Sequence, residues 1–395
     1  MKTLVVIAAG AADRALDELG GRTPLEAAAT PVLDRIAREG RIGRIVTAPS
    51  GRDPEDGAFA LALFGLDPVS YGEAGATLEA AALGVPVEPR DQVLRLALVA
   101  ADDKQIYDAT AGGLSRDEAA LLLESLGEAF SAEDLSFHAG HGARNLVVWK
   151  GARELRVKTT APFDAVGEKL KRVQPKGTGA RKLLEVMEAS REAFARHEVN
   201  ELRCELGENP ATLAWPWGPG ASVPLPEFTT RTGQDALVVG VDPCFLGAAR
   251  LQGIETVTPE GATGRPGTNL RAKAAAALQA LETHDLVYLH VDALAAAAHA
   301  RDFVAKVATI EKLDGYVLGP IVRALAGGLE SRLVVVGGPG IATETGCCLR
   351  QPAPFAIAGA GVRAHRRARF TEAAARDAGF QVDQPHELLP YLLQH

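Results

Sequence analysis

The sequence predicts an α/β fold, with a mainly parallel sheet flanked by helices and a small inserted α+β lobe. In the second half of the chain, short apolar runs alternate with helix-length segments, a pattern typical of parallel strands covered on both faces. The middle of the chain instead combines apolar strands with one amphipathic helix, between Pro86-Val-Glu-Pro-Arg and Pro175-Lys-Gly-Thr-Gly. We therefore expect a core of residues 1–87 and 180–395 and an inserted lobe of residues 88–179.

The individual elements follow from the periodicity of apolar residues. The core begins with a buried strand at 4–8 and a helix at 31–39 that has apolar residues at helical spacing. A second helix, at 58–64, stops at Gly65. In the lobe we expect strands at 92–101, 135–139 and 145–149 and a helix at 116–130. In the rest of the core we expect helices at 180–197 and 269–282 and strands at 236–240, 286–290, 332–336 and 354–358.

Composition narrows the class of protein. The 395 residues are 47% hydrophobic, and the formal net charge is −8. An acidic chain of this kind is not expected to bind nucleic acid or a membrane surface, and the short basic cluster at 363–369 is typical of a solvated surface. Four cysteines do not form a secreted disulfide framework, and no signal peptide or long apolar run is apparent, so a cytoplasmic location is expected.

In a parallel α/β sheet, ligands bind outside the carboxyl ends of the strands. The first strand runs into Ala9-Gly10, so alanine stands where such folds commonly place a functional side chain. Functional side chains are also expected at the other strand ends, which are Asp242, the segment 290–299 and the segment 337–340, and in the loop 50–57.

Several segments together resemble the archaeal-type 2,3-bisphosphoglycerate-independent phosphoglycerate mutases of the alkaline phosphatase superfamily. They occur in this order: GGRTPLEAAATPVLDRIAREG, LALFGLDP, HEVNELR, WPWGPG at 215–220, GATGRPGTNL at 261–270 and VATIEKLDGYVLGP at 307–320. The resemblance implies a phosphatase-like core interrupted by a substrate-covering lobe. It also implies transfer of a phosphoryl group between the hydroxyls of a glycerate, a reaction of glycolysis, through a phosphoserine with two divalent metals (manganese, magnesium or zinc). Two cations would neutralise the phosphoryl oxygens and help to deprotonate the nucleophile.

The resemblance also implies that most of the family's chemical groups are replaced here. Counting back from Leu61 places Asp56 at the position of the serine nucleophile. The lost metal-ligand positions are Ala9, Ala295, Gly338 and Pro339. His299 is the retained ligand, and Cys348 stands at a histidine position. Arg95 and Arg144 are candidate ligand-binding cations.

Each of these residues also has a plainer interpretation. His299 follows an alanine run, which is more typical of a packed or solvent-facing histidine than of a metal ligand. Cys348 and its neighbour Cys347 fit a structural role as well as metal or redox chemistry. Asp56 could act as a carboxylate nucleophile, but the acidic loop before it also fits a solvated turn that caps the next helix.

From these substitutions the sequence favours a divergent, catalytically inactive homologue that uses no cofactor and acts by binding or assembly. The alternative is an active phosphoglycerate mutase, or a related phosphotransferase or phosphatase, with a remodelled site. The expected partners are a small phosphorylated or acidic ligand and a second subunit, in a homo-oligomer or in a hetero-oligomer with an active homologue.

Overall fold

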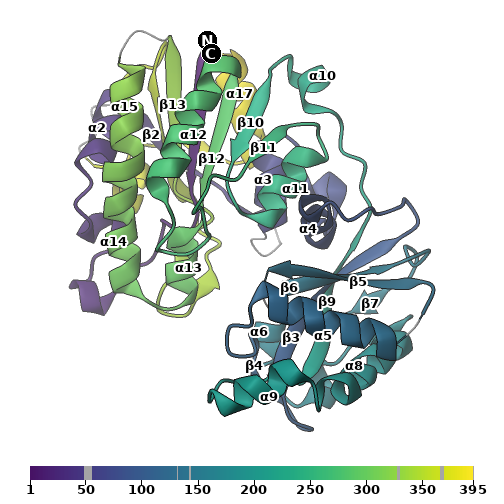
Figure 1. The fold of residues 1–395 in the computed structure, drawn as a ribbon. Helices are drawn as coiled ribbons and strands as arrows, with labels where there is room; N and C mark the ends of the chain where they lie inside the picture. The colour runs from purple at the N-terminus through teal and green to yellow at the C-terminus, as the bar shows by residue number, and fades with distance from the viewer. Residues whose placement is uncertain (49–55, 131, 142–143, 327–329, 365–368, 395) are drawn as a thin grey trace. The chain divides into compact units, whose positions relative to one another are not determined.

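The computed structural model describes residues 1–48, 56–130, 132–141, 144–326, 330–364 and 369–394. The described chain forms two compact units (Figure 1). The larger unit comprises Met1–Tyr71 and Leu225–His395, and the smaller unit comprises Gly72–Pro224. Since both chain segments of the larger unit build one sheet, the smaller unit is an insertion into it.

The larger unit is built on an eight-stranded sheet. Its strands are, in spatial order, β11 (Glu255–Val257), β10 (Ala236–Val239), β12 (Leu286–Val291), β1 (Lys2–Ala8), β13 (Ser331–Val336), β16 (Ala353–Gly359), β2 (Arg41–Ile45) and β17 (Gln381–Val382). The first five are mutually parallel, whereas β16 runs antiparallel to both of its neighbours. Strand β1 lies in the middle with Val5 opposite Tyr288 of β12 and Val334 of β13, and its residues Leu4–Ala8 are buried.

Helices cover the sheet because each has an apolar stripe to bury. Leu4 and Val6 of β1 pack in one core cluster with residues of α2, α12, α14 and α15. Figure 1 shows α14 and α15 following one another, with α12 beside them. The helices of this unit are α1 (Pro24–Ala27), α2 (Pro31–Glu39), α3 (Asp56–Leu63), α10 (Phe228–Thr232), α11 (Pro243–Arg250), α12 (Leu270–Thr283), α13 (Ala293–His299), α14 (Phe303–Leu313), α15 (Gly319–Leu325), α16 (Glu372–Asp377) and α17 (Leu388–Gln394). Single turns lie at Asp17–Leu19, Pro68–Tyr71 and Pro385–Glu387, and a π-helical segment at Asp314–Leu318 joins α14 to α15.

A second cluster, of aromatic side chains, joins α3 and α11 to the sheet. The ring centroid of Phe64 lies 4.8 Å from that of Phe245 and 4.9 Å from that of Tyr288. The Tyr288 hydroxyl donates to the Leu63 carbonyl at 3.0 Å, so its one polar atom is satisfied inside the core. The helix that begins at Asp56 is thereby fixed against β12.

The smaller unit is an antiparallel sheet packed against helices. Strand β3 (Gln92–Ala101) lies between β6 (Arg144–Trp149) and β9 (Leu213–Ala221), with β5 (Leu135–His141) beyond β6 and β4 (Ile106–Asp108) at the far end of β3. One core cluster joins β3 to α5 and α8. The other elements of this unit are α4 (Gly75–Leu83), α5 (Arg116–Ala129), α6 (Pro162–Ala165), α7 (Leu170–Val173), α8 (Ala180–Phe194), α9 (Glu198–Glu205), β7 (Val157–Lys158) and β8 (Lys176–Gly177).

The boundaries of the smaller unit differ from the lobe of residues 88–179 that the sequence predicts. The unit begins at Gly72 because α4 packs on β3 and β9, and it ends at Pro224 because β9 completes the sheet. The Trp-Pro-Trp-Gly segment is therefore a strand of the inserted unit rather than part of the core. Within the described part of the chain, no helix is long and apolar enough to cross a membrane.

Candidate functional site

The loops that follow the central strands are tied together at the carboxyl edge of the large sheet. The amide of Ala9 donates to the carbonyl of Val291 at 3.1 Å, which joins the ends of β1 and β12. The amide of Gly10 donates to the carbonyl of Pro339 at 2.8 Å, which joins the loop after β1 to the loop after β13. These loops thus form one ordered surface at the position where α/β sheets bind ligands.

At this surface the backbone segments approach too closely for larger side chains. A Cβ atom added to Gly10, whose φ is +80°, would lie 2.5 Å from the Cα of Ala295. A Cβ atom on Gly338 would lie 2.5 Å from the Cβ of Ala353. The close packing provides a physical reason for small residues here. The positions that the resemblance implies as lost metal ligands gather at this edge: Ala9, Ala295, Gly338 and Pro339.

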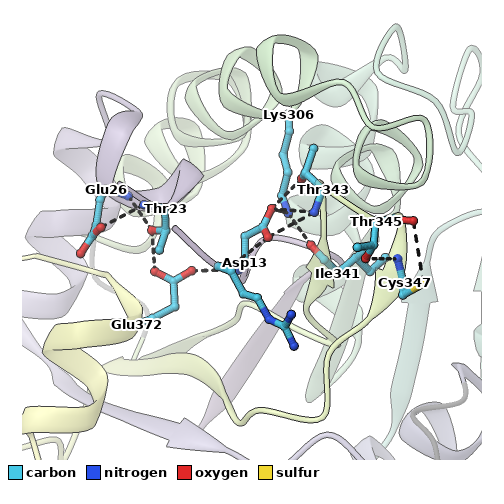
Figure 2. Close-up of polar contacts among 10 residues, drawn as sticks. Asp13, Thr23, Glu26, Lys306, Ile341, Thr343, Thr345, Cys347 and Glu372 are labelled. Carbon is cyan, nitrogen blue, oxygen red and sulfur yellow. Dashed lines mark hydrogen bonds and ion pairs between the residues drawn. The ribbon is translucent and has the colours of Figure 1, made fainter. Parts of the chain in front are cut away.

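A buried ion pair anchors the loop after β1 (Figure 2). The Nζ of Lys306 in α14 donates to the Oδ2 of Asp13 at 2.7 Å and to the Ile341 carbonyl at 3.0 Å. Thr343 donates to the same carboxylate from its amide, at 3.2 Å, and from its hydroxyl. Both side chains of the pair are fully buried. Burial lowers the pKa of Lys306 even though the Asp13 carboxylate opposes this shift.

The network continues to Glu372 at the start of α16 (Figure 2). Its two carboxyl oxygens accept from the Asp13 amide at 3.0 Å and from the Thr23 hydroxyl at 2.8 Å. Burial raises the pKa of Glu372 above its ordinary value. The polypeptide at Asp13 is therefore held from three directions, by α14, by the segment after β13 and by α16.

A cavity of about 510 Å³ adjoins this anchor. The described residues that line it are Arg14, Cys348, Arg350, Gln351 and Pro352. Arg14 follows the anchored Asp13 directly, and its amide donates to the Oδ1 of that residue at 2.7 Å. Two guanidinium groups and an exposed thiol therefore border one hollow at the carboxyl edge of the sheet.

His299 and Cys348 lie in neighbouring segments. His299 is the last residue of α13, and its Nδ1 lies 2.8 Å from the carbonyl oxygen of Gly346. Gly346 immediately precedes the short strand β15 (Cys347–Cys348), which pairs with β14 (Ile341–Ala342). The structure thus brings these two predicted residues into one region, with both cysteines of β15 exposed.

A second ionisable cluster lies at the end of β12. The Nδ1 of His290 lies 2.7 Å from the Oδ1 of Asp292, and the Nζ of Lys273 lies 3.9 Å from the Oδ2 of the same carboxylate. Burial disfavours the charged imidazole, but the Asp292 carboxylate outweighs it and raises the pKa of His290. Burial would raise the pKa of Asp292, but the neighbouring His290 lowers it. Each of the two groups therefore favours the charged form of the other.

Arg95 and Arg144 meet in the smaller unit. The Nε of Arg95 and the Nη2 of Arg144 lie 2.9 and 2.8 Å from the same Oε1 of Glu79. The Cζ of Arg95 also lies 4.8 Å from the ring centroid of Trp217. The Arg95 side chain is buried, whereas that of Arg144 is 52% exposed. The Glu79 carboxylate thus bridges the two guanidinium groups.

Asp56 is the first residue of α3, but its side chain and the loop 49–55 lie outside the described residues. Among the residues that are described, no group of three or more histidine, cysteine, aspartate or glutamate side chains could hold a metal ion. A hard divalent cation needs such a convergence of donors. The donor set of the described residues therefore does not fit a two-metal centre.

The fold of the described chain defines the class of protein. The fold is the α/β fold of the cofactor-independent phosphoglycerate mutases. A solved structure of a protein from Pyrococcus horikoshii matches with a TM-score of 0.81 and 25% identity, over all of this chain and 96% of that one. A cofactor-independent phosphoglycerate mutase from Thermoplasma acidophilum matches with a TM-score of 0.62 and 22% identity, over all of this chain and 99% of that one.

The sequence relatives then define the family. A family profile described as 2,3-bisphosphoglycerate-independent phosphoglycerate mutase matches residues 37–200. The mutase of Methanothrix thermoacetophila is 34% identical over 394 residues, and a probable mutase of Geobacter sulfurreducens is 32% identical over 403 residues. Each alignment covers all of both chains. This chain belongs to the 2,3-bisphosphoglycerate-independent phosphoglycerate mutase family, as its sequence motifs indicate.

The comparisons correct two expectations. The prediction of a catalytically inactive homologue is contradicted, because relatives aligned over the entire chain are named as phosphoglycerate mutases. The prediction that no cofactor is used is contradicted as well, because the family to which these relatives belong uses divalent metal ions. Both predictions depended on single positions at the strand ends, whereas the similarity extends over the whole chain.

Sequence reasoning missed the two arginines of the cavity and the buried anchor. Arg14 and Arg350 stand in loops that carry no recognisable motif, and only the fold brings them together. Lys306 offered a signal, because a lysine on the same helix face as Ile310 and Leu313 must find a buried counter-charge. The sequence could not show that this partner is Asp13, which lies 293 residues away.

Proposed function

We propose that this protein moves a phosphoryl group between the hydroxyls of a glycerate, as an active phosphoglycerate mutase with a remodelled site. The observation that carries the proposal is the 34% identity with the mutase of Methanothrix thermoacetophila over the whole of both chains. The ordered surface at the carboxyl edge of the large sheet supports it, because α/β sheets bind their ligands at this edge.

A related phosphotransferase or phosphatase is the second candidate. The small residues packed at the strand ends favour it, because a changed donor set alters which acceptor is placed in line with the phosphoryl group. In the mutase reaction the acceptor is the second hydroxyl of the glycerate, whereas in the phosphatase reaction it is water. Asp56 keeps its place as the candidate nucleophile in both. Assembly as a homo-oligomer or with an active homologue also stays a prediction.

The test is a coupled assay on the purified full chain. The conversion of 3-phosphoglycerate to 2-phosphoglycerate is followed through enolase and pyruvate kinase, with manganese, magnesium or zinc present in turn and with EDTA as the control. Release of inorganic phosphate is measured in parallel. The proposal expects metal-stimulated turnover that persists through size-exclusion chromatography. Absence of turnover with every metal, while a relative assayed beside it is active, would contradict it.

A further inference from the structure

We propose that the groove between α5 and β5 binds an extended peptide, which adds as a strand to β5 and carries an apolar side chain beside a basic one. The groove lies within the smaller unit, and its use does not depend on the mutase activity. It combines an outer strand edge, a hollow with a mostly apolar lining and a negative rim.

Strand β5 is an edge strand. The sheet of the smaller unit has the order β4-β3-β6-β5, so β5 pairs with β6 on one side and ends the described sheet on the other. In an antiparallel pair, alternate residues direct their amide and carbonyl groups away from the partner strand. The outer side of β5 therefore presents backbone donors and acceptors that an added strand can use.

The edge of β5 carries none of the residues that usually block an exposed strand. Residues 135–140 read Leu-Ser-Phe-His-Ala-Gly, without proline, lysine, arginine or a carboxylate. The pairing with β6 is regular from Leu135 to His138. The Oγ of Ser136 lies 2.9 Å from the Nε2 of His138, and burial lowers the pKa of His138, which favours the neutral imidazole. The edge is therefore regular and uncharged, which suits the addition of a strand.

A hollow beside this edge can receive a side chain. Its volume is about 390 Å³, within the range of roughly 300–1,000 Å³ that ligand sites occupy. Its apolar lining includes Ala120, Leu123 and Gly127 from one face of α5, and Leu135 and Phe137 from β5. Since every second side chain of a strand points to the same face, a peptide paired with β5 would direct a side chain into this hollow.

Gly127 is the observation that most favours an occupant. It lies inside α5 (Arg116–Ala129), where glycine weakens a helix relative to alanine. A Cβ atom added there would meet nothing closer than the Cδ2 of Phe137, at 4.0 Å. Neither the helical backbone nor the packing therefore requires glycine at this position. What glycine does provide is open space between the helix and Phe137.

The rim of the groove is negative. Glu124 lines it, Glu128 lies one turn further along α5, and both residues are exposed. Within the described part of the chain neither forms an ion pair, and no lysine or arginine lines the groove. Like charges four residues apart on a helix repel each other, so a basic residue of the peptide would relieve this repulsion. Pairing of β5 with β5 of a second copy would instead bring two such rims together, in a chain whose net charge is −8.

A peptide selection tests the groove without a known ligand. Random peptides of about eight residues, the length of a typical strand, are displayed on phage and selected on the immobilised full chain. The same library is selected on the Gly127→Leu variant, in which a side chain fills the hollow. We expect enrichment on the parent of peptides with an apolar residue within two positions of lysine or arginine. The most enriched peptide is then synthesised with a fluorescent label, and its Kd is measured by anisotropy.

Variants of the protein and of the peptide test each part of the groove. Gly127→Leu should weaken binding by about 10- to 100-fold, the effect of losing a buried apolar side chain. Glu124→Gln combined with Glu128→Gln should weaken it by about 3- to 10-fold at low salt and less at high salt. The controls are Ala129→Leu, on the same helix but outside the lining, and Glu282→Gln in α12 of the larger unit, both at exposed residues. N-methylation of alternate peptide amides should weaken binding by about 10-fold or more.

Two further measurements locate the peptide and check the fold. Hydrogen exchange of the β5 amides should slow in the complex. Gly127→Ala should raise the melting temperature of the smaller unit by about 2–4 °C, and a lower melting temperature would show that the fold requires this glycine and would overturn the argument.

The remaining outcomes are decisive in the same way. Equal enrichment on the parent and on Gly127→Leu, equal binding of the N-methylated peptide, or protection of amides outside β5 would each overturn the peptide site. A dimer of the full chain that Gly127→Leu dissociates, seen by sedimentation velocity, would assign the edge to a second copy and would also overturn it. None of these results depends on turnover of 3-phosphoglycerate, so the mutase activity stands or falls separately.

Discussion

The buried pair of Asp13 and Lys306 is predicted to dominate the stability of the larger unit. Asp13→Asn keeps the size of the side chain but removes its charge, so the Lys306 ammonium stays buried without a counter-ion. Both side chains are 0% exposed and their charged atoms lie 2.7 Å apart, a geometry in which removing one partner costs about 3–5 kcal/mol. We expect a loss of this size in the free energy of unfolding of the larger unit.

The tryptophans make the assay specific to one unit. All three lie in the smaller unit, at positions 149, 215 and 217. In a urea titration, tryptophan fluorescence therefore reports on the smaller unit, while far-ultraviolet circular dichroism reports on both. We expect Asp13→Asn to shift only the unfolding transition of the larger unit, which is seen by circular dichroism and not by tryptophan fluorescence. Hydrogen exchange of β1 peptides locates the same loss in the sheet.

A double variant separates the ion pair from local packing. Lys306→Met alone should also destabilise the unit, because it leaves the Asp13 carboxylate buried and unpaired. Asp13→Asn combined with Lys306→Met should be more stable than the sum of the single losses by about 2–3 kcal/mol. A loss below about 1 kcal/mol for Asp13→Asn, or strict additivity in the double variant, would refute the reasoning.

Three further predictions follow from the same geometry. Because the pKa of His290 is raised, its charged form stabilises the folded protein fully below the ordinary pKa of 6.5, and this stabilisation is lost as pH rises through the raised pKa. The difference in unfolding free energy between the parent and His290→Gln should therefore shrink with rising pH. A difference that grows with pH would contradict the pairing with Asp292. Gly10→Ala should destabilise the larger unit by about 1–3 kcal/mol, because it combines a φ of +80° with a clash against Ala295; an unchanged melting temperature would contradict the close approach. Asp56→Asn should abolish turnover without lowering the melting temperature, whereas retained turnover would exclude this carboxylate as the nucleophile.

Most of the fold could be predicted because its elements carry strong local patterns. The strand at 92–101 and the helix at 31–39 coincide with β3 and α2, since the first is a continuous apolar run and the second has a clear helical spacing. The boundary of the inserted unit could not be predicted in the same way. Strand β9 contains the Pro-Trp-Gly-Pro-Gly sequence, and proline and glycine are residues that normally indicate a loop.

The candidate site could be predicted only in part, for a different physical reason. The ends of the strands predicted a site at the carboxyl edge of the sheet, and the motif positions led to His299 and Cys348, which lie in neighbouring segments. The convergence of Arg14 and Arg350 depends on two loops joined by backbone hydrogen bonds, and no local pattern reports such a contact. The inactive state was predicted wrongly because substitutions at single positions were given more weight than similarity along the whole chain.

One measurement tests the central claim most directly. The purified chain is incubated with 3-phosphoglycerate and a divalent metal, quenched with EDTA and analysed by ³¹P nuclear magnetic resonance, which resolves 2-phosphoglycerate from inorganic phosphate. The account predicts that the 2-phosphoglycerate resonance appears. A spectrum that retains only the 3-phosphoglycerate resonance with every metal would contradict it.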